Sequence, residues 1–311
     1  MRNATSRQNR GVRLLKQLAR YKVRLIFIWI GLCFFIVFKY VPMYGLVIAF
    51  QNYRIGNAFL HGPWVGFDHF ATFFENPDFT RVIRNTLLIS LYRLVFTFFP
   101  PIVLAILLNE VTRSWFKRWV QTLTYLPHFL SWVIIYGITF AFLSEGTGLV
   151  NQWIKQLGFS TIGFLQSEEW FRTILVSTDL WKDLGWSTII YMASIASINP
   201  ELYEAANIDG AGKRRQIWHV TLPGIGSVII LLFIIRLGHV MDAGLEQILV
   251  FYNPLVYAVG DIIDTWTYRM GIMEGRYSLA SAVGVFKSLV GLALIIGANW
   301  IARRWNDSGI W

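Results

Sequence analysis

The sequence predicts an all-α integral membrane protein with six membrane-spanning helices. Of its 311 residues, 55% are hydrophobic and only 15% are charged, whereas roughly a quarter of the residues in soluble domains are charged. Several apolar runs approach the roughly 20 residues that a helix needs to cross a bilayer. Basic residues gather before the first of these runs and in short connections between the others. This pattern indicates a multi-pass membrane protein and argues against a soluble domain.

Six apolar ranges are long enough to be the spans. They are 25–50, 84–108, 119–143, 171–197, 223–242 and 278–302. The chain then divides into a basic N-terminal segment (1–24), one membrane domain (25–302) and a short C-terminal tail (303–311). No linker, low-complexity run or fixed-period repeat interrupts the membrane domain.

The distribution of positive charge predicts the orientation. With the N-terminus inside the cell, the inner segments hold sixteen Lys and Arg residues, against seven in or beside the outer connections. Basic residues near the spans favour the cytoplasmic side. We therefore expect an even number of spans with both ends of the chain inside, and long outer connections at 51–83, 144–170 and 243–277.

Other function classes fit the sequence poorly. The net charge of +10 could indicate nucleic-acid binding, but eight of the 28 Lys and Arg residues lie in the first 24 positions, just before an apolar run. The single cysteine, Cys33, leaves no partner for an intrachain disulfide. Histidines are scattered, and no metal-binding or nucleophile motif is present. We expect no catalytic residue, no metal site and no nucleic-acid partner.

A polar, basic island of about two dozen residues at 198–223 separates two apolar ranges. Asn199 is a good N-cap and Pro200 suits the first position of a helix, which predicts a helix over 200–208. Gly210 can adopt the positive φ that turns the chain. A second helix should begin near residue 212, and Pro223 should mark the start of the next span.

The island resembles the EAA loop of ABC-importer permeases, the cytoplasmic segment that couples a permease to its ATPase. The motif is Glu-Ala-Ala, three residues, Gly-Ala, then a hydrophobic residue, any residue and Leu-Pro, in the inner loop before the fifth of six spans. Val220 stands where the family usually has Ile, which is a conservative change. The resemblance implies a type I ABC importer permease fold and assigns the ATPase-coupling loop to Glu204, Ala205, Ala206, Asp209, Gly210, Leu222 and Pro223.

The segment 210–213, Gly-Ala-Gly-Lys, superficially looks like a phosphate-binding loop. Asn207 stands where the first P-loop glycine should be, Arg214 replaces the Ser or Thr, and no strand precedes the segment. We therefore expect no ATP hydrolysis and no cofactor in this chain, with ATP and Mg²⁺ bound by the partner ATPase.

Further motifs resemble the permeases of the oligosaccharide and polysaccharide uptake group. They lie at 40–45, 49–51, 64–67, 84–86, 126–128, 179–182 and 277–284. The resemblance implies import of a complex sugar, such as a pectin- or alginate-derived oligosaccharide, across a bacterial cell membrane. It also implies a second, homologous permease subunit, two ATPase subunits and an extracytoplasmic solute-binding protein as partners.

Charged and aromatic residues within the spans predict the substrate path, because sugars favour aromatic platforms beside hydrogen-bonding groups. Trp181, Trp186 and Tyr191 lie near Asp179 and Asp183 in the span that leads into the island, and Lys287 lies near the middle of the last span. We expect Trp181, Trp186, Tyr191 and Lys287 to line the path. The alternatives are aromatics packed against helices or lipid, and a lysine neutralised by a carboxylate elsewhere in the bundle.

Three other readings remain. A secondary transporter would have inverted repeats and no ATPase dock. A membrane enzyme would need convergent catalytic groups, and none is visible. A permease of the same family for another nutrient, such as an amino acid or phosphate, cannot be separated from a sugar permease by composition.

Overall fold

The computed structural model describes residues 21–54, 56 and 61–306. These residues are almost entirely helical and contain no strand beyond an isolated antiparallel bridge between Gln51 and Trp64. The predicted all-α class is therefore confirmed. The predicted basic segment lies largely outside the described residues, as does most of the C-terminal tail.

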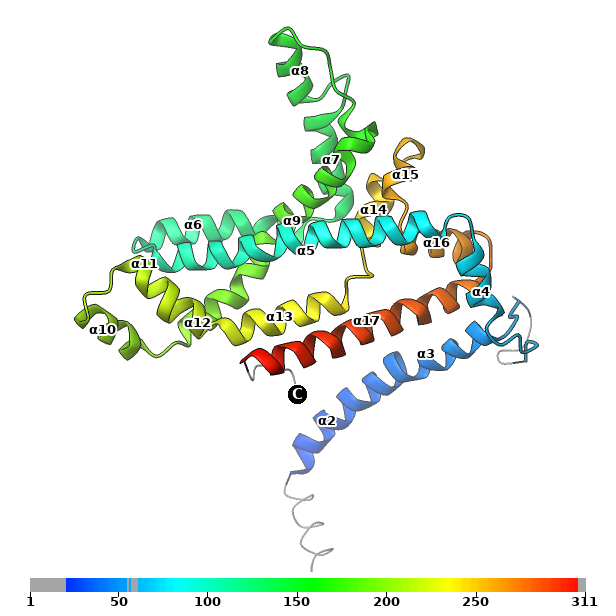
Figure 1. The fold of residues 1–311 in the computed structure, drawn as a ribbon, viewed down its shortest axis with the longest axis horizontal. Coiled ribbons are helices and arrows are strands. Elements are labelled where there is room, and N and C mark those ends of the chain that lie inside the picture. The colour runs from blue at the N-terminus through cyan, green and yellow to red at the C-terminus, as the bar shows by residue number, and fades with distance from the viewer. Residues whose placement is uncertain (1–20, 55, 57–60, 307–311) are drawn as a thin grey trace, which may run out of the picture.

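The chain begins with one nearly continuous helical rod of α-, π- and 3₁₀-helical segments. It consists of α2 (Lys22–Phe35), η1 (Ile36–Tyr40), α3 (Val41–Met43) and η2 (Tyr44–Phe50). The rod is apolar over its length, and none of the residues in its most apolar stretch is buried. In Figure 1 it diverges from the other helices, and only its final part approaches α17.

The body of the molecule is built on long helices. They are α5 (Phe79–Glu110), α6 (Ser114–Tyr125), α9 (Glu168–Ala196), α13 (Gly226–Gly238) and α17 (Tyr277–Asn306). Helix α9 packs along α5, and buried Phe98 of α5 and Tyr191 of α9 share one apolar cluster with Ile225. Gly185 allows α9 to cross α6 closely, because a Cβ there would lie 2.3 Å from the Thr124 carbonyl oxygen.

The third predicted span is bent, not straight. Helix α6 leads through η3 (Leu126–Phe129) into α7 (Trp132–Leu143), and the two directions differ by 108°. Pro127 lies in the turn. Lys182 of α9 donates hydrogen bonds to the carbonyl oxygens of His128 (2.8 Å) and Leu130 (2.5 Å), which the bend leaves without helical partners. Helices α7 and α8 (Leu149–Gln156) consequently form an arm that leaves the bundle (Figure 1).

The fifth predicted span is also shorter than expected. Helix α12 (Leu222–Gly224) meets α13 at an angle of 57°, and α13 ends at Gly238 rather than at residue 242. The chain then turns through Gly244, which has a φ of +83°. Gly291 allows α17 to cross the end of α13 closely, because a Cβ there would lie 2.6 Å from the Gly238 carbonyl oxygen.

Short helices connect α13 to α17. They are α14 (Leu245–Phe251), η6 (Pro254–Val256), α15 (Tyr257–Gly260), α16 (Ile263–Tyr268) and η7 (Arg269–Met273). Trp266 of α16 is buried against Phe73 of α4 (Asp68–Glu75), a short helix in segment 51–83. The sequence did not predict that this connection folds back between α5, α9 and α17.

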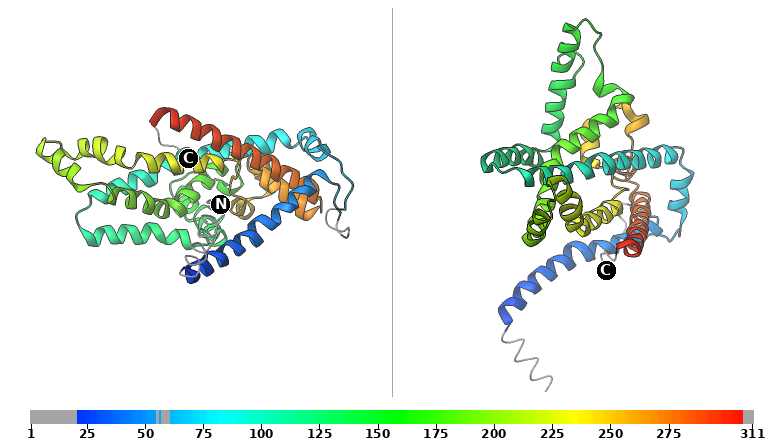
Figure 2. Two further views of the ribbon diagram at one scale, coloured as in Figure 1. Left: turned by 90° about the horizontal axis from the view of Figure 1, so that it is seen from below. Right: turned by 60° about the vertical axis from the view of Figure 1, so that its left-hand side comes forward.

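Among the described residues, three helical stretches are long and apolar enough to cross a membrane, and two bent pairs would bring the number to five. The remaining predicted range, 171–197, corresponds to α9, which is 29 residues long but carries Asp179, Lys182 and Asp183 in its middle. The loop at 198–223 lies at one end of the bundle and α4 and α16 lie at the other (Figures 1 and 2).

Candidate functional site: a docking loop and a line of polar cavities

The polar island folds as the sequence predicts. Helix α10 spans Pro200–Ile208, and the Asn199 side chain caps it by accepting a hydrogen bond from the Glu201 amide. Gly210 has a φ of +73°, in the region that favours glycine. Helix α11 (Lys213–Gln216) follows and continues through the π-helical turn η5 (Ile217–Thr221) into α12. The island is thus a helix-turn-helix loop.

Two side-chain contacts hold the arms of this loop together. Gln216 is buried, and its Nε2 donates hydrogen bonds to Asn207 Oδ1 (2.5 Å) and to the Ala211 carbonyl oxygen (2.9 Å). The hydroxyl groups of Tyr203 and Thr221 are hydrogen-bonded at 2.9 Å. Because these contacts bridge the turn on both sides, the loop can move as one unit.

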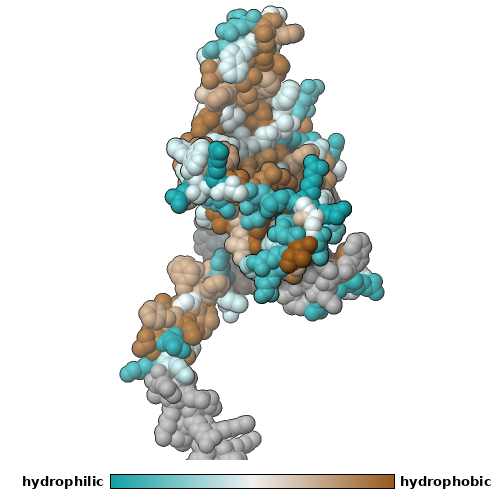
Figure 3. All heavy atoms as spheres, turned by 90° about the vertical axis from the view of Figure 1, so that its left-hand side faces the viewer, coloured by the Kyte–Doolittle hydropathy of each residue, from teal (hydrophilic) through white to brown (hydrophobic). Residues whose placement is uncertain are grey.

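The outer face of the loop is small, polar and accessible. Glu204, Ala205 and Asp209 are exposed and Ala206 is half-buried. Ile208 has 87% of its surface exposed at the end of α10. Figure 3 looks at this end of the molecule and shows hydrophilic residues around a small hydrophobic spot. Leu202 and Trp218 are also exposed in this loop. Exposed apolar side chains beside small residues and carboxylates are suited to a protein partner.

The loop is joined to the long helices at two points. Lys213 Nζ lies 3.0 Å from Glu110 Oε2 at the end of α5. At Gly224, a Cβ would lie 2.7 Å from Cδ1 of Ile198, so the start of α13 passes close to the end of α9. Leu222 and Pro223 lie in α12, where the bend into α13 occurs. A force on the loop would therefore act on α5, α9 and α13.

A first polar cavity of about 220 Å³ lies between α5, α9 and α13. Arg93 Nε lies 3.9 Å from Asp179 Oδ2, and Arg93 also hydrogen-bonds to Gln247. Arg236 Nη1 donates to Thr97 Oγ1 (2.6 Å). Charges in such surroundings are costly unless they are paired or face water. Their concentration around one cavity indicates a hydrated space inside the bundle.

A second cavity of about 480 Å³ lies on the other side of the α13 terminus, against α17. Lys287 reaches into it and forms ion pairs with Asp264 of α16 and with Asp242, whose Oδ1 lies 2.7 Å away. His239 and Asp242 line both cavities. The two cavities therefore adjoin where α13 ends.

The structure places the four predicted path residues in different surroundings. Lys287 lines the second cavity. Trp186 stacks on His128, with parallel rings 4.4 Å apart, and remains 45% exposed, while Trp181 is 43% exposed. Tyr191 is only 3% exposed and packs in the core.

Sequence reasoning noted the charges of Asp179, Asp183 and Lys287 but not those of Asp242 or Asp264. Asp242 carried a signal, since it is a charge inside a predicted span. Asp264 lies in a segment read as an outer connection, and only the fold-back of α16 brings it to Lys287.

At the far end of the bundle, a buried carboxylate anchors the fold-back. Asp261 has no exposed surface, and its Oδ2 lies 2.9 Å from Arg269 Nη2 and 3.1 Å from Arg81 Nη2 of α5. Burial raises the pKa of the Asp261 carboxyl, but hydrogen bonds from Arg269 and Thr265 outweigh burial and hold its pKa below the ordinary value. The charged form of Asp261 is therefore part of the folded structure.

The same anchor reaches α9. Asn85 Nδ2 donates to the carbonyl oxygens of Ala258 and Asp261, both at 3.0 Å. Arg172 Nη2 donates to Asn85 Oδ1 at 2.8 Å. Helices α5 and α9 thus hold the connection between α13 and α17 at the end opposite the loop at 198–223.

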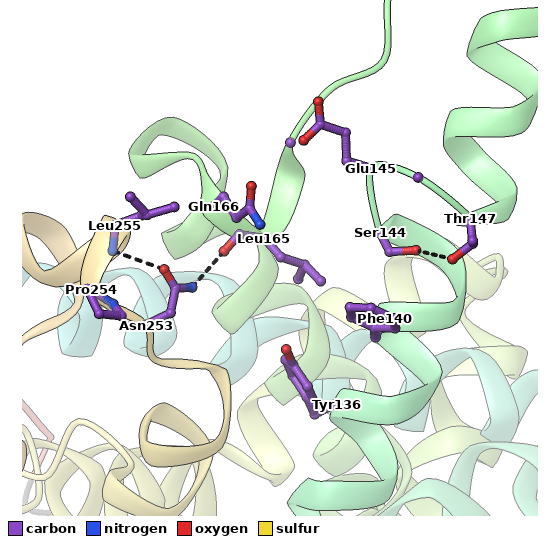
Figure 4. A pocket seen from close by; sticks show the side chains of 12 residues that line it. Tyr136, Phe140, Ser144, Glu145, Thr147, Leu165, Gln166, Asn253, Pro254 and Leu255 are labelled. Atoms are coloured by element: carbon purple, nitrogen blue, oxygen red, sulfur yellow. Dashed lines mark hydrogen bonds between the residues drawn. The ribbon is translucent and has the colours of Figure 1, made fainter.

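A third cavity of about 550 Å³ opens between the end of α7 and the α14–η6 connection. Figure 4 shows Tyr136 and Phe140 on one side, Asn253 and Leu255 on the other, and Glu145 above them. Asn253 is held by donating to the Leu165 carbonyl oxygen (3.1 Å) and accepting from the Leu255 amide (3.1 Å).

Residues 98–307 match the model of the family described as "Binding-protein-dependent transport system inner membrane component". The chain belongs to this family: it is a membrane permease of binding-protein-dependent transport, and not an enzyme. This region includes the helix-turn-helix loop at 198–223 and the α13 and α17 residues of both polar cavities.

The chain is similar to two proteins of Bacillus subtilis (strain 168). It is 46% identical to Protein LplB over 301 residues, covering 97% of this chain and 95% of that protein. It is 44% identical to the polygalacturonan/rhamnogalacturonan transport system permease protein YteP over 299 residues, covering 96% of this chain and 93% of that protein.

The structure is similar to a chain in the crystal structure of a bacterial alginate ABC transporter in complex with an alginate pentasaccharide-bound periplasmic protein. The TM-score is 0.86 at 41% identity, and the match covers 96% of this chain and 100% of that chain. The fold is that of a type I ABC importer permease, as the sequence predicted.

Proposed function

We propose that this chain forms half of the translocation path of an ATP-driven importer for a complex sugar, such as a pectin- or alginate-derived oligosaccharide. The name of YteP and the alginate transporter structure, each above 40% identity over nearly the whole chain, support this substrate class. A permease for another nutrient is the alternative.

The observation that carries the coupling role is the geometry of the loop at 198–223. It presents Glu204, Ala205 and Ala206 on a short helix, turns at Gly210 and continues directly into α12 and α13. We propose that this face, with Asp209, Leu222 and Pro223, docks into a separate ATPase. That subunit would bind ATP and Mg²⁺, and this chain would carry no cofactor.

The assembly would contain two ATPase subunits, a second, homologous permease and an extracytoplasmic solute-binding protein. Dependence on a binding protein is a property of the family. The exposed apolar surface of α2 would face lipid or the second permease. A secondary transporter would need none of these subunits, and an ATPase dock would have no use in it.

The topology would be six spans with both ends inside a bacterial cell membrane, one membrane domain at 25–302 and α9 as the charged fourth span. Cysteine labelling in a Cys33→Ser background tests this. A membrane-impermeant thiol reagent should label a cysteine at Gly158 in intact cells and should leave one at Lys213 unlabelled. Labelling at Lys213 would contradict the orientation.

We propose that the two adjoining cavities line the path. Lys287 and the polar groups at the end of α13 would contact the sugar, with Trp186 and Trp181 providing aromatic faces along α9. The charges there are Arg93, Arg236 and Lys287 against Asp179, Asp183, Asp242 and Asp264, so the lining holds one more carboxylate than cations. This lining would keep the space hydrated.

Reconstitution tests the function directly. The chain is assembled with the proposed second permease and ATPase subunits in lipid nanodiscs. ATP hydrolysis should rise when the solute-binding protein is added with oligogalacturonates or alginate oligosaccharides, and should not rise with amino acids or phosphate. If ATP hydrolysis rises only with a different nutrient, and not with these oligosaccharides, the sugar assignment is rejected and the permease role remains.

A further inference from the structure

The cavity between α7 and the α14–η6 connection lies away from the docking loop and from the two polar cavities, and it contains an acidic group. We propose that this cavity receives a lysine or arginine side chain from the surface of the extracytoplasmic solute-binding protein. The inference rests on the proposed function, because that topology puts the loops around this cavity outside the cell.

Two aromatic rings form one wall. Tyr136 and Phe140 lie one turn apart on α7, with ring centroids 6.2 Å apart and planes inclined by 41°. Tyr136 is fixed edge-on against Phe251 of α14 at 5.1 Å. Phe140 keeps 48% of its surface exposed. A cation over such a ring is attracted by its negative face, so this wall is suited to a positively charged group.

A carboxylate lies at the rim of the same cavity. Glu145 follows the end of α7, and its Oε2 would be 3.3 Å from a Cβ built at Gly163, so a glycine there leaves room for the carboxylate (Figure 4). Among the described residues, Glu145 has no ion-pair or hydrogen-bond partner for its side chain, and no Lys or Arg lines the cavity. The cavity therefore has a net negative charge.

The remaining wall is apolar and rigid. Leu165, Pro254 and Leu255 line it, and the bonds that Asn253 makes to both loops fix their separation. Lysine and arginine side chains carry a long apolar stem and a charged end. The stem would lie along these residues and Phe140, while the charged end would reach Glu145.

A sugar fits this cavity less well. The hydroxyl groups of Ser144 and Thr147 are bonded to each other at 3.0 Å, and the Asn253 amide is used within the loops. Few free polar side chains remain to bind sugar hydroxyls. The carboxylate of Glu145 would also repel the uronate groups of pectin or alginate fragments.

Binding of the purified solute-binding protein to the nanodisc-embedded transporter tests the inference without requiring a known sugar. Glu145→Gln should weaken the Kd about tenfold, the effect of losing one close charge pair. Phe140→Ala should weaken it by a smaller factor. Glu169→Gln is the matched control, since Glu169 is an exposed carboxylate at the start of α9 that does not line this cavity. Raised salt should weaken binding to the wild type more than to Glu145→Gln.

The outcomes separate the two proposals. A Glu145→Gln transporter that binds the solute-binding protein as tightly as the wild type, while the wild type itself binds normally, overturns the inference and leaves the importer function intact. Unchanged protein binding combined with weaker retention of oligogalacturonate would assign the cavity to sugar and would also overturn it. If the wild type does not bind the solute-binding protein at all, the proposed importer function is contradicted, and with it the inference that rests on it.

Discussion

Gln216, at the end of α11, donates a hydrogen bond across the turn to Asn207 Oδ1 in α10, 2.5 Å away. The two residues are the inner link of the docking loop, and Gln216 is almost fully buried. Sequence motifs marked the exposed positions of this loop and did not mark Gln216. If the loop docks into an ATPase as proposed, this hydrogen bond would keep it from deforming when it is pushed.

Replacing Gln216 by leucine should uncouple the loop. The side chain keeps its bulk, but Asn207 Oδ1 and the Ala211 carbonyl oxygen lose their donor, and each hydrogen bond lost costs about 0.5–1.5 kcal/mol. Hydrogen exchange should become faster over residues 203–221. ATP hydrolysis should respond less to the solute-binding protein.

Arg214→Leu is the control for this substitution, because Arg214 is exposed in the same helix. If hydrogen exchange in Gln216→Leu matches that of the wild type, Gln216 does not hold the loop together.

Gly210 and Gly212 offer a matched pair of glycines. A Cβ added at either position would have no other group within 4 Å. The two differ in backbone conformation, because Gly210 has a φ of +73° and Gly212 has a φ of −66°. Gly210→Ala should therefore strain the turn by about 1–2 kcal/mol, while Gly212→Ala should be tolerated. Transport-coupled ATP hydrolysis should fall for Gly210→Ala alone, in transporters that assemble equally well. Equal ATP hydrolysis by the two variants would show that coupling does not depend on the positive φ at Gly210.

The sequence predicted the docking loop almost residue by residue because its signals are local. Capping by Asn199, a proline at the first helical position and a glycine at the turn each act within a few residues. The same holds for α5 and α17, whose apolar runs match the predicted ranges within five residues at each end. Local signals of this kind need no tertiary structure to be read.

The bend after α6 was missed because only part of its cause is local. Pro127 lies in the 108° turn, but the carbonyl oxygen of Leu130 is bound there by Lys182, 52 residues further along the chain. Similarly, Asp264 reaches Lys287 only because α16 folds back into the bundle. Hydropathy reports how apolar a segment is and contains no information on such contacts.

Lys287 and Asp264 should show strong non-additivity. Lys287→Met leaves the mostly buried Asp264 without its cation, and breaking a buried pair costs about 3–5 kcal/mol. Assembly of the transporter should fall. The double variant Lys287→Met/Asp264→Asn removes both charges, so assembly should recover.

Uptake by this double variant separates the two roles of Lys287. Because Lys287 also lines the cavity proposed as the path, uptake per assembled complex should remain reduced. Full recovery of uptake would mean that Lys287 serves only to balance Asp264.

Trp186 and Tyr191 lie in the same helix and should respond differently to truncation. Trp186 is 45% exposed and Tyr191 is 3% exposed. Tyr191→Ala should leave a cavity in the core and lower the stability of the fold by about 3–5 kcal/mol, as for other large aromatic residues. Less complex should therefore assemble. Trp186→Ala, and to a smaller extent Trp181→Ala, should assemble normally and lower uptake. Uptake that is unchanged after correction for assembled complex would exclude both tryptophans from the path.

Asp261 predicts how the outer end of the molecule responds to acid. Its pKa is lower in the folded protein than in the unfolded chain. Burial raises it, but hydrogen bonds from Arg269, Thr265 and Tyr252, together with the positive charge of Arg269, outweigh burial. A lowered pKa contributes stability above the unfolded value, near 3.9 for aspartate, and this stability is lost as the pH falls through the folded value. The fold-back at 252–269 should therefore stay protected from proteolysis at neutral and mildly acidic pH and become sensitive only below about pH 4. Asp261→Asn, which lacks the charge at every pH, should be sensitive already at pH 7 and should lose the acid dependence. Equal protection of Asp261→Asn and the wild type at pH 7 would show that the ion pairs with Arg81 and Arg269 do not anchor this segment.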